Sequence, residues 1–265
     1  MLELKGLTKI FDKGTVNQQT ALSSIDFNLN DGDFVTILGS NGAGKSTLFG
    51  AICGSFWPDK GYVMLNGENI TYLPEHVRAR KIGILFQDPM KGTAPDMTVA
   101  ENLALAYTRG HRFPLSRALQ HKDTEYLRDR LAGFNMGLEN RMKVKVGLLS
   151  GGQRQAMTLL MATIAKPKLL LLDEHTAALD PAAAENVLEI TKEIVREQSL
   201  PAMMITHNMT TALALGNRTI MMERGKIILD IAGEERAGMD VDDLLLMYSG
   251  KQGKQLDNDR MMLQI

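Results

Sequence analysis

The sequence predicts an α/β fold in which helices cover both faces of a mixed, mostly parallel sheet. Two observations support this fold class. Short apolar runs with the composition of buried parallel strands occur at 34–38, 82–86, 169–172 and 202–206. Segments of helical character follow two of these runs, at 45–52 and 181–198. Strands that alternate with helices in this way are typical of a parallel sheet.

The turn after the first apolar run matches the phosphate-binding pattern Gly-x-x-x-x-Gly-Lys-Ser. It consists of Gly39, Ser40, Asn41, Gly42, Ala43, Gly44, Lys45, Ser46 and Thr47. Glycines let consecutive N–H groups point at phosphate oxygens, and the following helix N-terminus adds partial positive charge. We expect Lys45 to reach the β- and γ-phosphates and the Ser46 hydroxyl to bind Mg²⁺. A chance match in a chain of this length is roughly a one-in-a-hundred event, so an ordinary glycine-rich turn is the lesser alternative. The turn therefore predicts a P-loop NTPase core.

The segments around this core predict two smaller parts. Residues 1–33 contain two strand-like runs, and the period-two alternation from Ser24 to Leu29 indicates a half-exposed antiparallel strand. We expect an N-terminal antiparallel β subdomain there. Residues 88–166 have helical character, with a capping box at Thr98 and Glu101, and predict an inserted α-helical subdomain.

Composition excludes several classes of protein. The 265 residues include 30 Lys and Arg against 31 Asp and Glu, for a net charge of -1. Without a global basic field we expect no nucleic-acid partner. Because the first residues include an acid and lack a continuous apolar core, we expect no secretory signal. The sequence contains no run of about 18 apolar residues, the length needed to span a bilayer, so we expect no membrane-spanning helix. The single cysteine, Cys53, fits a reducing cytosol.

Polar residues suited to nucleotide chemistry follow the other apolar runs. They are Gln87, Asp173 with Glu174, and His207. In an open α/β sheet, ligands bind at the carboxyl ends of the strands, so we expect these residues to converge on one crevice. Each residue by itself could be an ordinary polar residue at a strand end. Three such strand ends together with the phosphate turn at the end of the first run favour a site.

These side chains suggest distinct roles. Asp173 can hold Mg²⁺, directly or through a water, and Gln87 can bridge Mg²⁺ and the attacking water. Glu174 is suited to orient or deprotonate that water. His207 can donate to a γ-phosphate oxygen. Phe11, at the end of the first strand-like run, could stack on a purine or equally cap the apolar face of its strand.

A second anion-binding turn opens the helical stretch that ends near Ala165. It consists of Ser150, Gly151, Gly152 and Gln153, and it has no lysine. One nucleotide does not need two such turns. We therefore expect the second turn to serve the nucleotide of another subunit.

Together these motifs resemble the ATP-binding subunit of ATP-binding-cassette (ABC) transporters over about residues 1–230. The resemblance makes residues 39–47 the Walker A motif, Gln87 the Q-loop, 149–153 the signature, 169–173 Walker B, Glu174 the catalytic glutamate, 177–180 the D-loop and His207 the switch histidine. It also makes Phe11 the aromatic residue that stacks on adenine. In this family two cassettes associate head to tail, and each ATP lies between one Walker A motif and the other chain's signature.

Two positions depart from the family pattern. His175 stands where proline usually follows the catalytic glutamate, and Ala177 begins the D-loop in place of the more usual serine. Both positions lie where the two nucleotide sites of such a dimer communicate. The departures therefore bear on the coupling between these sites more than on ATP hydrolysis. Residues 173–180, with 147–150 upstream, are similar to a bacterial subgroup of uptake systems for tryptophan, tyrosine or related small molecules.

The resemblance implies an ATPase that closes as a dimer, expected to be a homodimer, on ATP and Mg²⁺. We expect it to drive a separate integral-membrane permease from the cytoplasmic face of the cell membrane. Import of a small molecule such as an amino acid, with a substrate-binding protein acting through the permease, is the expected activity. The apolar residues that we expect to contact the permease, with local packing as the alternative, are Pro89, Met90, Pro95 and Met97.

Other functions remain open at this point. The main alternative is a non-transport ABC ATPase that acts as an assembly or regulatory factor. A nucleotide-gated scaffold would bind ATP without turnover. The expected domain organisation is an ATPase domain at 1–230, with a core at 1–87 and 167–230 and the helical subdomain at 88–166, followed by a C-terminal extension at 231–265.

Overall fold

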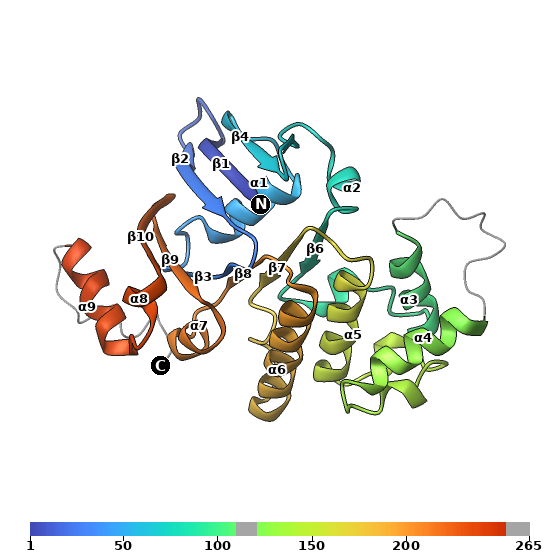
Figure 1. Cartoon of the computed structure of the whole chain (residues 1–265). Coiled ribbons are helices and arrows are strands. Elements are labelled where there is room, and N and C mark those ends of the chain that lie inside the picture. The colour runs from blue at the N-terminus through green and yellow to red at the C-terminus, as the bar shows by residue number, and fades with distance from the viewer. Residues whose placement is uncertain (110–120, 253–265) are drawn as a thin grey trace. The chain divides into compact units, whose positions relative to one another are not determined.

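The computed structural model describes residues 1–109 and 121–252 (Figure 1). The chain divides into two compact units. The first unit consists of Met1–Ala79 and Pro201–Ile265, and the second consists of Arg80–Leu200.

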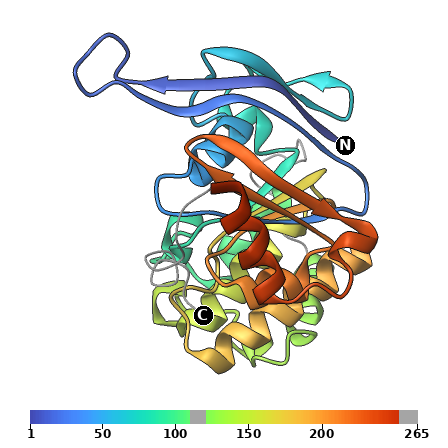
Figure 2. The ribbon, with the colours of Figure 1, turned by 90° about the vertical axis from the view of Figure 1, so that its left-hand side faces the viewer.

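The first unit begins with an antiparallel sheet. Its strands are β1 (Leu2–Phe11), β2 (Gln19–Leu29), β4 (Lys60–Leu65) and β5 (Glu68–Asn69), in the order β2-β1-β4-β5. Figure 2 shows β1 and β2 side by side, with their connecting loop beyond the strand ends. Ile25, Phe27 and Leu29 are buried while Asp26 and Asn28 are exposed, which confirms the predicted alternation.

The same unit contains strands with mixed pairing, in the order β10-β9-β3-β8. They are β3 (Phe34–Leu38), β8 (Ala202–Ile205), β9 (Arg218–Glu223) and β10 (Lys226–Ala232). β3 pairs in parallel with β8 and β9, whereas β9 and β10 form an antiparallel hairpin. Every residue of β3 and β8 is buried, as the apolar runs predicted.

The first unit also contains several helices. They are α1 (Lys45–Cys53), α2 (Glu75–Arg78), α7 (Met209–Leu215), α8 (Gly233–Arg236) and α9 (Val241–Gln252). Figure 1 shows α1 between the antiparallel sheet and β3. Met209 of α7 and Leu244 of α9 share a buried cluster with Leu38 and Met221 of the sheet. The Arg236 guanidinium of α8 donates to the Ala212, Leu213 and Gly216 carbonyls, which closes the C-terminal end of α7.

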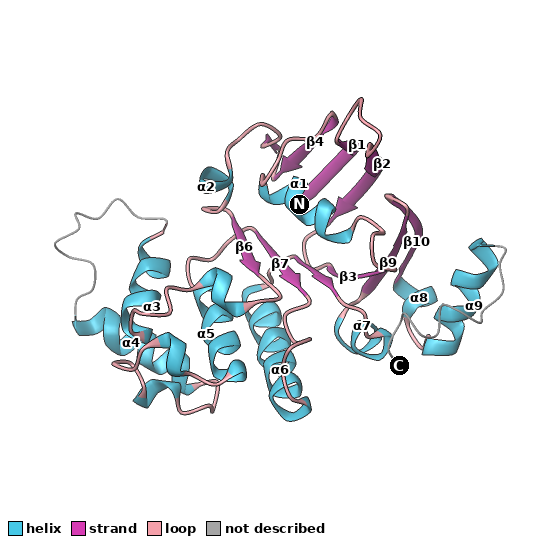
Figure 3. Cartoon of the chain, turned by 180° about the vertical axis from the view of Figure 1, so that it is seen from behind, coloured by secondary structure: helices cyan, strands magenta, loops and turns pink. Residues whose placement is uncertain are grey.

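The second unit has two parallel strands and a group of helices. The strands are β6 (Ile82–Leu85) and β7 (Leu169–Asp173). The α-helices are α3 (Val99–Thr108), α4 (His121–Ala132), α5 (Gly151–Thr163) and α6 (Pro181–Gln198), and the short 3₁₀ helices are η1 (Pro89–Gly92), η3 (Leu138–Asn140) and η4 (Val146–Leu148). Figure 3 shows α5 beside α6, and α5 also contacts α3 and α4. Parallel strands and surrounding helices confirm the α/β class.

Helix starts in this unit follow the side-chain signals in the sequence. Thr98 and Glu101 form the predicted capping box of α3, and Asp180 caps α6 by accepting from the Ala183 N–H at 3.0 Å. The helix expected from Gln153 to Ala165 instead begins at Gly151 and ends at Thr163. It starts earlier because Ser150 is its N-cap, so the two glycines form its first turn. The expected domain boundaries stay a prediction, and residues 253–265 of the C-terminal extension lie outside the described residues.

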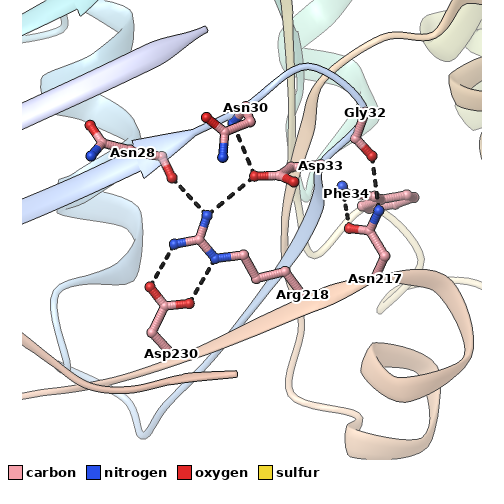
Figure 4. A network of polar contacts seen from close by, with 8 residues as sticks. All are labelled: Asn28, Asn30, Gly32, Asp33, Phe34, Asn217, Arg218 and Asp230. Carbon is pink, nitrogen blue, oxygen red and sulfur yellow. Dashed lines mark hydrogen bonds and ion pairs between the residues drawn. The ribbon is translucent and has the colours of Figure 1, made fainter. Parts of the chain in front are cut away.

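Arg218 ties β9 to its neighbours in the first unit (Figure 4). Its guanidinium donates to both carboxylate oxygens of Asp230 on β10, at 2.7 and 2.6 Å. It also donates to the Asn28 carbonyl at 2.7 Å and to Asp33 at 3.2 Å. Its Cζ lies 4.9 Å from the centre of the Phe27 ring. The guanidinium of Arg218 therefore holds both β10 and the β2–β3 turn against β9.

We predict that Arg218→Lys lowers the free energy of unfolding by about 1 to 2 kcal/mol, because lysine cannot form the two-pronged contact with Asp230. Chemical denaturation measures this. Arg130→Lys is the control, since Arg130 makes a single 3.9 Å ion pair with the exposed Glu197. It should change stability by less than about 0.5 kcal/mol. Equal losses in the two variants would contradict the prediction.

Candidate nucleotide-binding site

The P-loop (residues 39–47) joins the end of β3 to the start of α1. Gly42 and Gly44 have φ angles of 80° and 103°, a region that glycine enters without strain. The buried Lys45 ammonium donates to the Gly39 carbonyl at 2.6 Å and to the Ser40 carbonyl at 3.1 Å. The loop therefore curls around its own lysine, at the N-terminus of a helix where anions are stabilised.

Backbone segments of the first unit enclose this loop. The Gly225 N–H, in the β9–β10 turn, donates to the Ala43 carbonyl at 2.9 Å, and the Gly225 carbonyl accepts from the Ser23 N–H at 2.8 Å. A Cβ atom on Gly44 would lie 2.5 Å from the Ala21 carbonyl oxygen, and one on Gly39 would collide with the Met222 carbonyl oxygen. The sequence analysis missed the contact of Gly225 with the P-loop, because no sequence pattern marks it.

His207 follows β8 in the same unit. β8 pairs in parallel with β3, with Ile205 opposite Ile37, and the Thr206 N–H donates to the Ile37 carbonyl at 3.2 Å. His207 is half-buried, and the helix after it is capped by Asn208, which accepts from the Thr211 N–H at 2.8 Å. The strand pairing therefore brings His207 level with the start of the P-loop.

Phe11 ends β1. Its ring meets the Phe56 ring edge-on, with centroids 5.4 Å apart, and the Lys9 ammonium lies 5.4 Å from its centroid. The Phe11 side chain is 36% exposed. An aromatic ring that is supported on its edge and accessible from solvent can stack on a base, so stacking on adenine stays a prediction.

In the second unit, strand pairing brings Gln87 and Asp173 together. β6 and β7 run parallel, with Leu85 opposite Leu172, so the segments that follow the two strands begin at the same level of the sheet. Gln87 and Asp173 line one pocket of about 350 Å³, together with Lys91. Carboxylate and amide oxygens are ligands that suit Mg²⁺.

Glu174 and His175 begin the β7–α6 turn (residues 174–180). Glu174 has a φ of 45°, and its carbonyl accepts from the Ala177 N–H at 3.0 Å. His175 is buried, with its Nε2 atom 3.2 Å from the Thr191 hydroxyl of α6. Burial lowers the pKa of His175 to about 4, so the imidazole is neutral at neutral pH.

The signature turn (residues 149–153) is organised by its own side chains. The Ser150 hydroxyl accepts from the Gln153 N–H, and the Gln153 side-chain oxygen accepts from the Ser150 N–H, both at 3.3 Å. The Gln153 amide group also donates to the Met136 carbonyl at 3.0 Å. The turn is therefore preformed at the N-terminus of α5, and Ser150 is exposed there.

The two signature glycines allow close packing of α5 on the β7–α6 turn and α6. A Cβ atom on Gly151 would lie 3.1 Å from the Leu179 side chain, and one on Gly152 would lie 2.9 Å from the Ala183 side chain. Larger residues would push α5 away from α6. The D-loop residue Ala177, by contrast, is exposed.

Sequence and structural comparisons identify the family. The sequence profile described as "ABC transporter" matches residues 22–177. The chain belongs to the ABC transporter family. It is 42% identical to the tyrosine transport ATP-binding protein of Clostridioides difficile, over 92% of this chain and 97% of that protein. It is 35% identical to the thiamine import ATP-binding protein ThiQ of Photobacterium profundum, over 94% of this chain and all (100%) of ThiQ.

Solved ABC cassettes share the fold. The structure matches a dimeric, post-hydrolysis state of the ATP-binding cassette MJ0796 bound to ADP and Pi, with a TM-score of 0.76 and 26% identity. The match covers 90% of this chain and 100% of that one. This ABC protein is therefore an ATP-binding subunit and an ATPase, peripheral to the membrane. Within residues 1–109 and 121–252, no helix is long and apolar enough to cross a bilayer.

We predict that Gly225→Ala raises the KM for ATP and lowers the free energy of unfolding by about 2 to 4 kcal/mol. An alanine there has the unfavourable φ of 75°, and its Cβ atom lies 2.7 Å from the Ala21 carbonyl oxygen that borders the P-loop. The measurements are ATPase kinetics and denaturation.

Gly67→Ala is the matched control, because Gly67 has a φ of 79° and a Cβ atom added there would have no neighbouring atom within 4 Å. It should lower stability by only about 1 to 2 kcal/mol and leave the KM unchanged. A Gly225→Ala enzyme with a normal KM would contradict the role of the β9–β10 turn in shaping the P-loop.

Proposed function

We propose that this ABC ATPase works as a head-to-tail homodimer, with each ATP held between the P-loop of one copy and the signature turn of the other. The supporting observation is that one chain has two glycine-containing turns at helix N-termini, where anions are stabilised, and that of these two turns the P-loop has a lysine and the signature turn has none. The dimeric state of the solved cassette MJ0796 also supports this arrangement.

The P-loop residues have a defined role in this proposal. The N–H groups of residues 39–47 and the Lys45 ammonium bind the phosphates, and Phe11 stacks on the adenine. Lys45 exchanges its contacts with the Gly39 and Ser40 carbonyls for phosphate oxygens. A phosphate compensates the lysine charge better than two neutral carbonyls.

Ser46, Gln87 and Asp173 would hold Mg²⁺ in this proposal. Their hydroxyl, amide and carboxylate oxygens are hard donors, and Gln87 and Asp173 share one pocket. Within the described parts of the chain, no group of three or more His, Cys, Asp or Glu residues could hold a metal ion. One carboxylate fits Mg²⁺, which is usually bound by one or two carboxylates together with substrate phosphates. When bound, Mg²⁺ neutralises charge that develops on the phosphates.

Glu174 and His207 would complete the hydrolytic machinery. Glu174 follows the metal-binding Asp173, and its carboxylate accepts a proton from the attacking water or orients it. Gln87 orients the same water through its amide. His207 donates a hydrogen bond to the γ-phosphate oxygens, where charge increases during the reaction.

The proposed partner is an integral-membrane permease, which the ATPase drives from the cytoplasmic face of the membrane. A substrate-binding protein would deliver the substrate to the permease. Met90 is 37% exposed in η1, and Pro89, Pro95 and Met97 are half-buried nearby, so this segment has apolar surface for such a contact. The proposed transport is import of an amino acid, supported by the 42% identity to a tyrosine transport ATP-binding protein.

We predict that Glu174→Gln lowers kcat by about a hundredfold or more while ATP affinity is retained, because the amide cannot accept the proton. The ATP-bound variant should accumulate as a dimer, which size-exclusion chromatography with light scattering measures. Glu174→Gln combined with Lys45→Ala is the control and should stay monomeric with ATP. A monomeric Glu174→Gln protein at saturating ATP would contradict the shared site.

We predict that His207→Ala lowers kcat by roughly tenfold to a hundredfold with little change in ATP affinity, because the lost hydrogen bond matters most in the transition state. ATPase kinetics and equilibrium nucleotide binding measure the two quantities. Unchanged turnover would leave His207 as a structural residue at the end of β8.

The transport assignment is tested by purification of the ATPase from membranes, followed by mass spectrometry of the bound proteins. We expect a permease and a substrate-binding protein, and loss of amino-acid uptake when Lys45→Ala replaces the wild-type chain. Co-purification with soluble assembly partners, and normal uptake in the Lys45→Ala strain, would support an assembly or regulatory factor instead.

A further inference from the structure

The β7–α6 turn is anchored at the residue directly after Glu174. His175 is 3% exposed and Thr191 is 0% exposed, so their contact is shielded from water. The His175 Nε2 atom lies 3.2 Å from the Thr191 hydroxyl oxygen. The two residues are 16 positions apart, and Thr191 belongs to the middle of α6. The contact therefore joins the end of β7 to the long helix of the second unit.

The direction of this hydrogen bond follows from the other contact of Thr191. The Thr191 hydroxyl donates its proton to the Val187 carbonyl at 2.7 Å. Its oxygen is then left to accept, so the His175 Nε2–H donates to it. This assigns the Nε2-protonated neutral tautomer to His175. In this contact the His175 ring is the donor and the Thr191 hydroxyl oxygen is the acceptor.

The anchor constrains the backbone of Glu174. Glu174 has a φ of 45°, a conformation that non-glycine residues adopt only when their surroundings impose it. Its neighbour His175 points into the unit, while Glu174 itself is partly exposed. A buried side chain on one residue thus fixes the direction in which the preceding carboxylate leaves the chain.

We propose that His175 and Thr191 are positioning residues for the Glu174 carboxylate, acting through the hydrogen bond between them. The inference rests on the proposed role of Glu174 as the residue that orients or deprotonates the attacking water. Proline, which is usual at this position in the family, would restrict the backbone through its ring. Here the turn is held by a side-chain contact to α6.

The same helix also connects the segment that presents Glu174 to the signature turn of the same unit. α6 begins at Pro181, and its Ala183 side chain packs on the Gly152 position of the signature turn. The same helix holds His175 through Thr191. A shift of α6 at the signature turn therefore reaches the segment that presents Glu174.

The test compares the ATPase kinetics of Thr191→Val and wild-type protein. Valine has the shape of threonine but cannot accept the His175 hydrogen bond. We expect kcat to fall by about fivefold to tenfold, with the KM for ATP within about twofold of wild type, because a misplaced base slows the reaction without weakening nucleotide binding. Thr191→Ser keeps the hydroxyl and should restore kcat to within about twofold of wild type.

Thr163→Val is the matched control. Thr163 is also 0% exposed, and its hydroxyl also donates to the carbonyl four residues earlier, that of Leu159, at 2.7 Å. It lies on α5, away from the β7–α6 turn. Its substitution removes a comparable buried hydroxyl and should leave kcat unchanged. Equal loss of kcat in Thr191→Val and Thr163→Val would overturn the proposal.

A double-mutant cycle provides a second measurement that does not depend on one variant. His175→Leu should lower kcat about as much as Thr191→Val, and the double variant should be no slower than the slower single variant. If the losses of kcat in the two single variants multiply in the double variant, the two residues act independently and the proposal is overturned. A kcat of Thr191→Val within twofold of wild type would also overturn it. Glu174→Gln separates the two hypotheses: full turnover in that variant would overturn the role of Glu174 itself.

Discussion

The nucleotide site depends on close contact between the P-loop backbone and the backbone around it. Gly44 lies against the Ala21 carbonyl, Gly39 against the Met222 carbonyl, and the Gly225 N–H binds the Ala43 carbonyl. Peptide groups at this distance leave no room for side chains, so the loop shape is set by hydrogen bonds and steric exclusion. A loop held in this way keeps its N–H groups oriented before nucleotide arrives, which reduces the entropy lost on binding.

The second unit is organised around α6 in a comparable way. Its first turn is capped by Asp180 and packs on the signature glycines, and its middle accepts the hydrogen bond from His175. Both Glu174 and the signature turn are thus attached to one stiff element. In a head-to-tail dimer, as proposed here, these two groups would act on different nucleotides. The helix then gives a physical route by which the state of one site affects the other.

Much of the fold could be predicted from the sequence. The predictions were most accurate for elements that are specified by residues close together in the chain. The buried strands and the capping box at Thr98 and Glu101 were confirmed, because each depends on residues close together in the chain. Element ends were less accurate. α5 begins two residues before the predicted start because Ser150 is its cap.

The sequence by itself determined which chemical groups are present: a lysine in a glycine-rich turn, acids and amides after apolar strands, and a second glycine-containing turn without lysine at the start of a helix. These are recognisable because phosphate binding requires particular residues at short, regular spacing. Only the tertiary structure decided which segments support them. The contact of Gly225 with the P-loop and the burial of His175 against Thr191 join residues that are far apart in the chain. Such contacts depend on how strands and helices pack, and packing leaves no pattern in a single sequence.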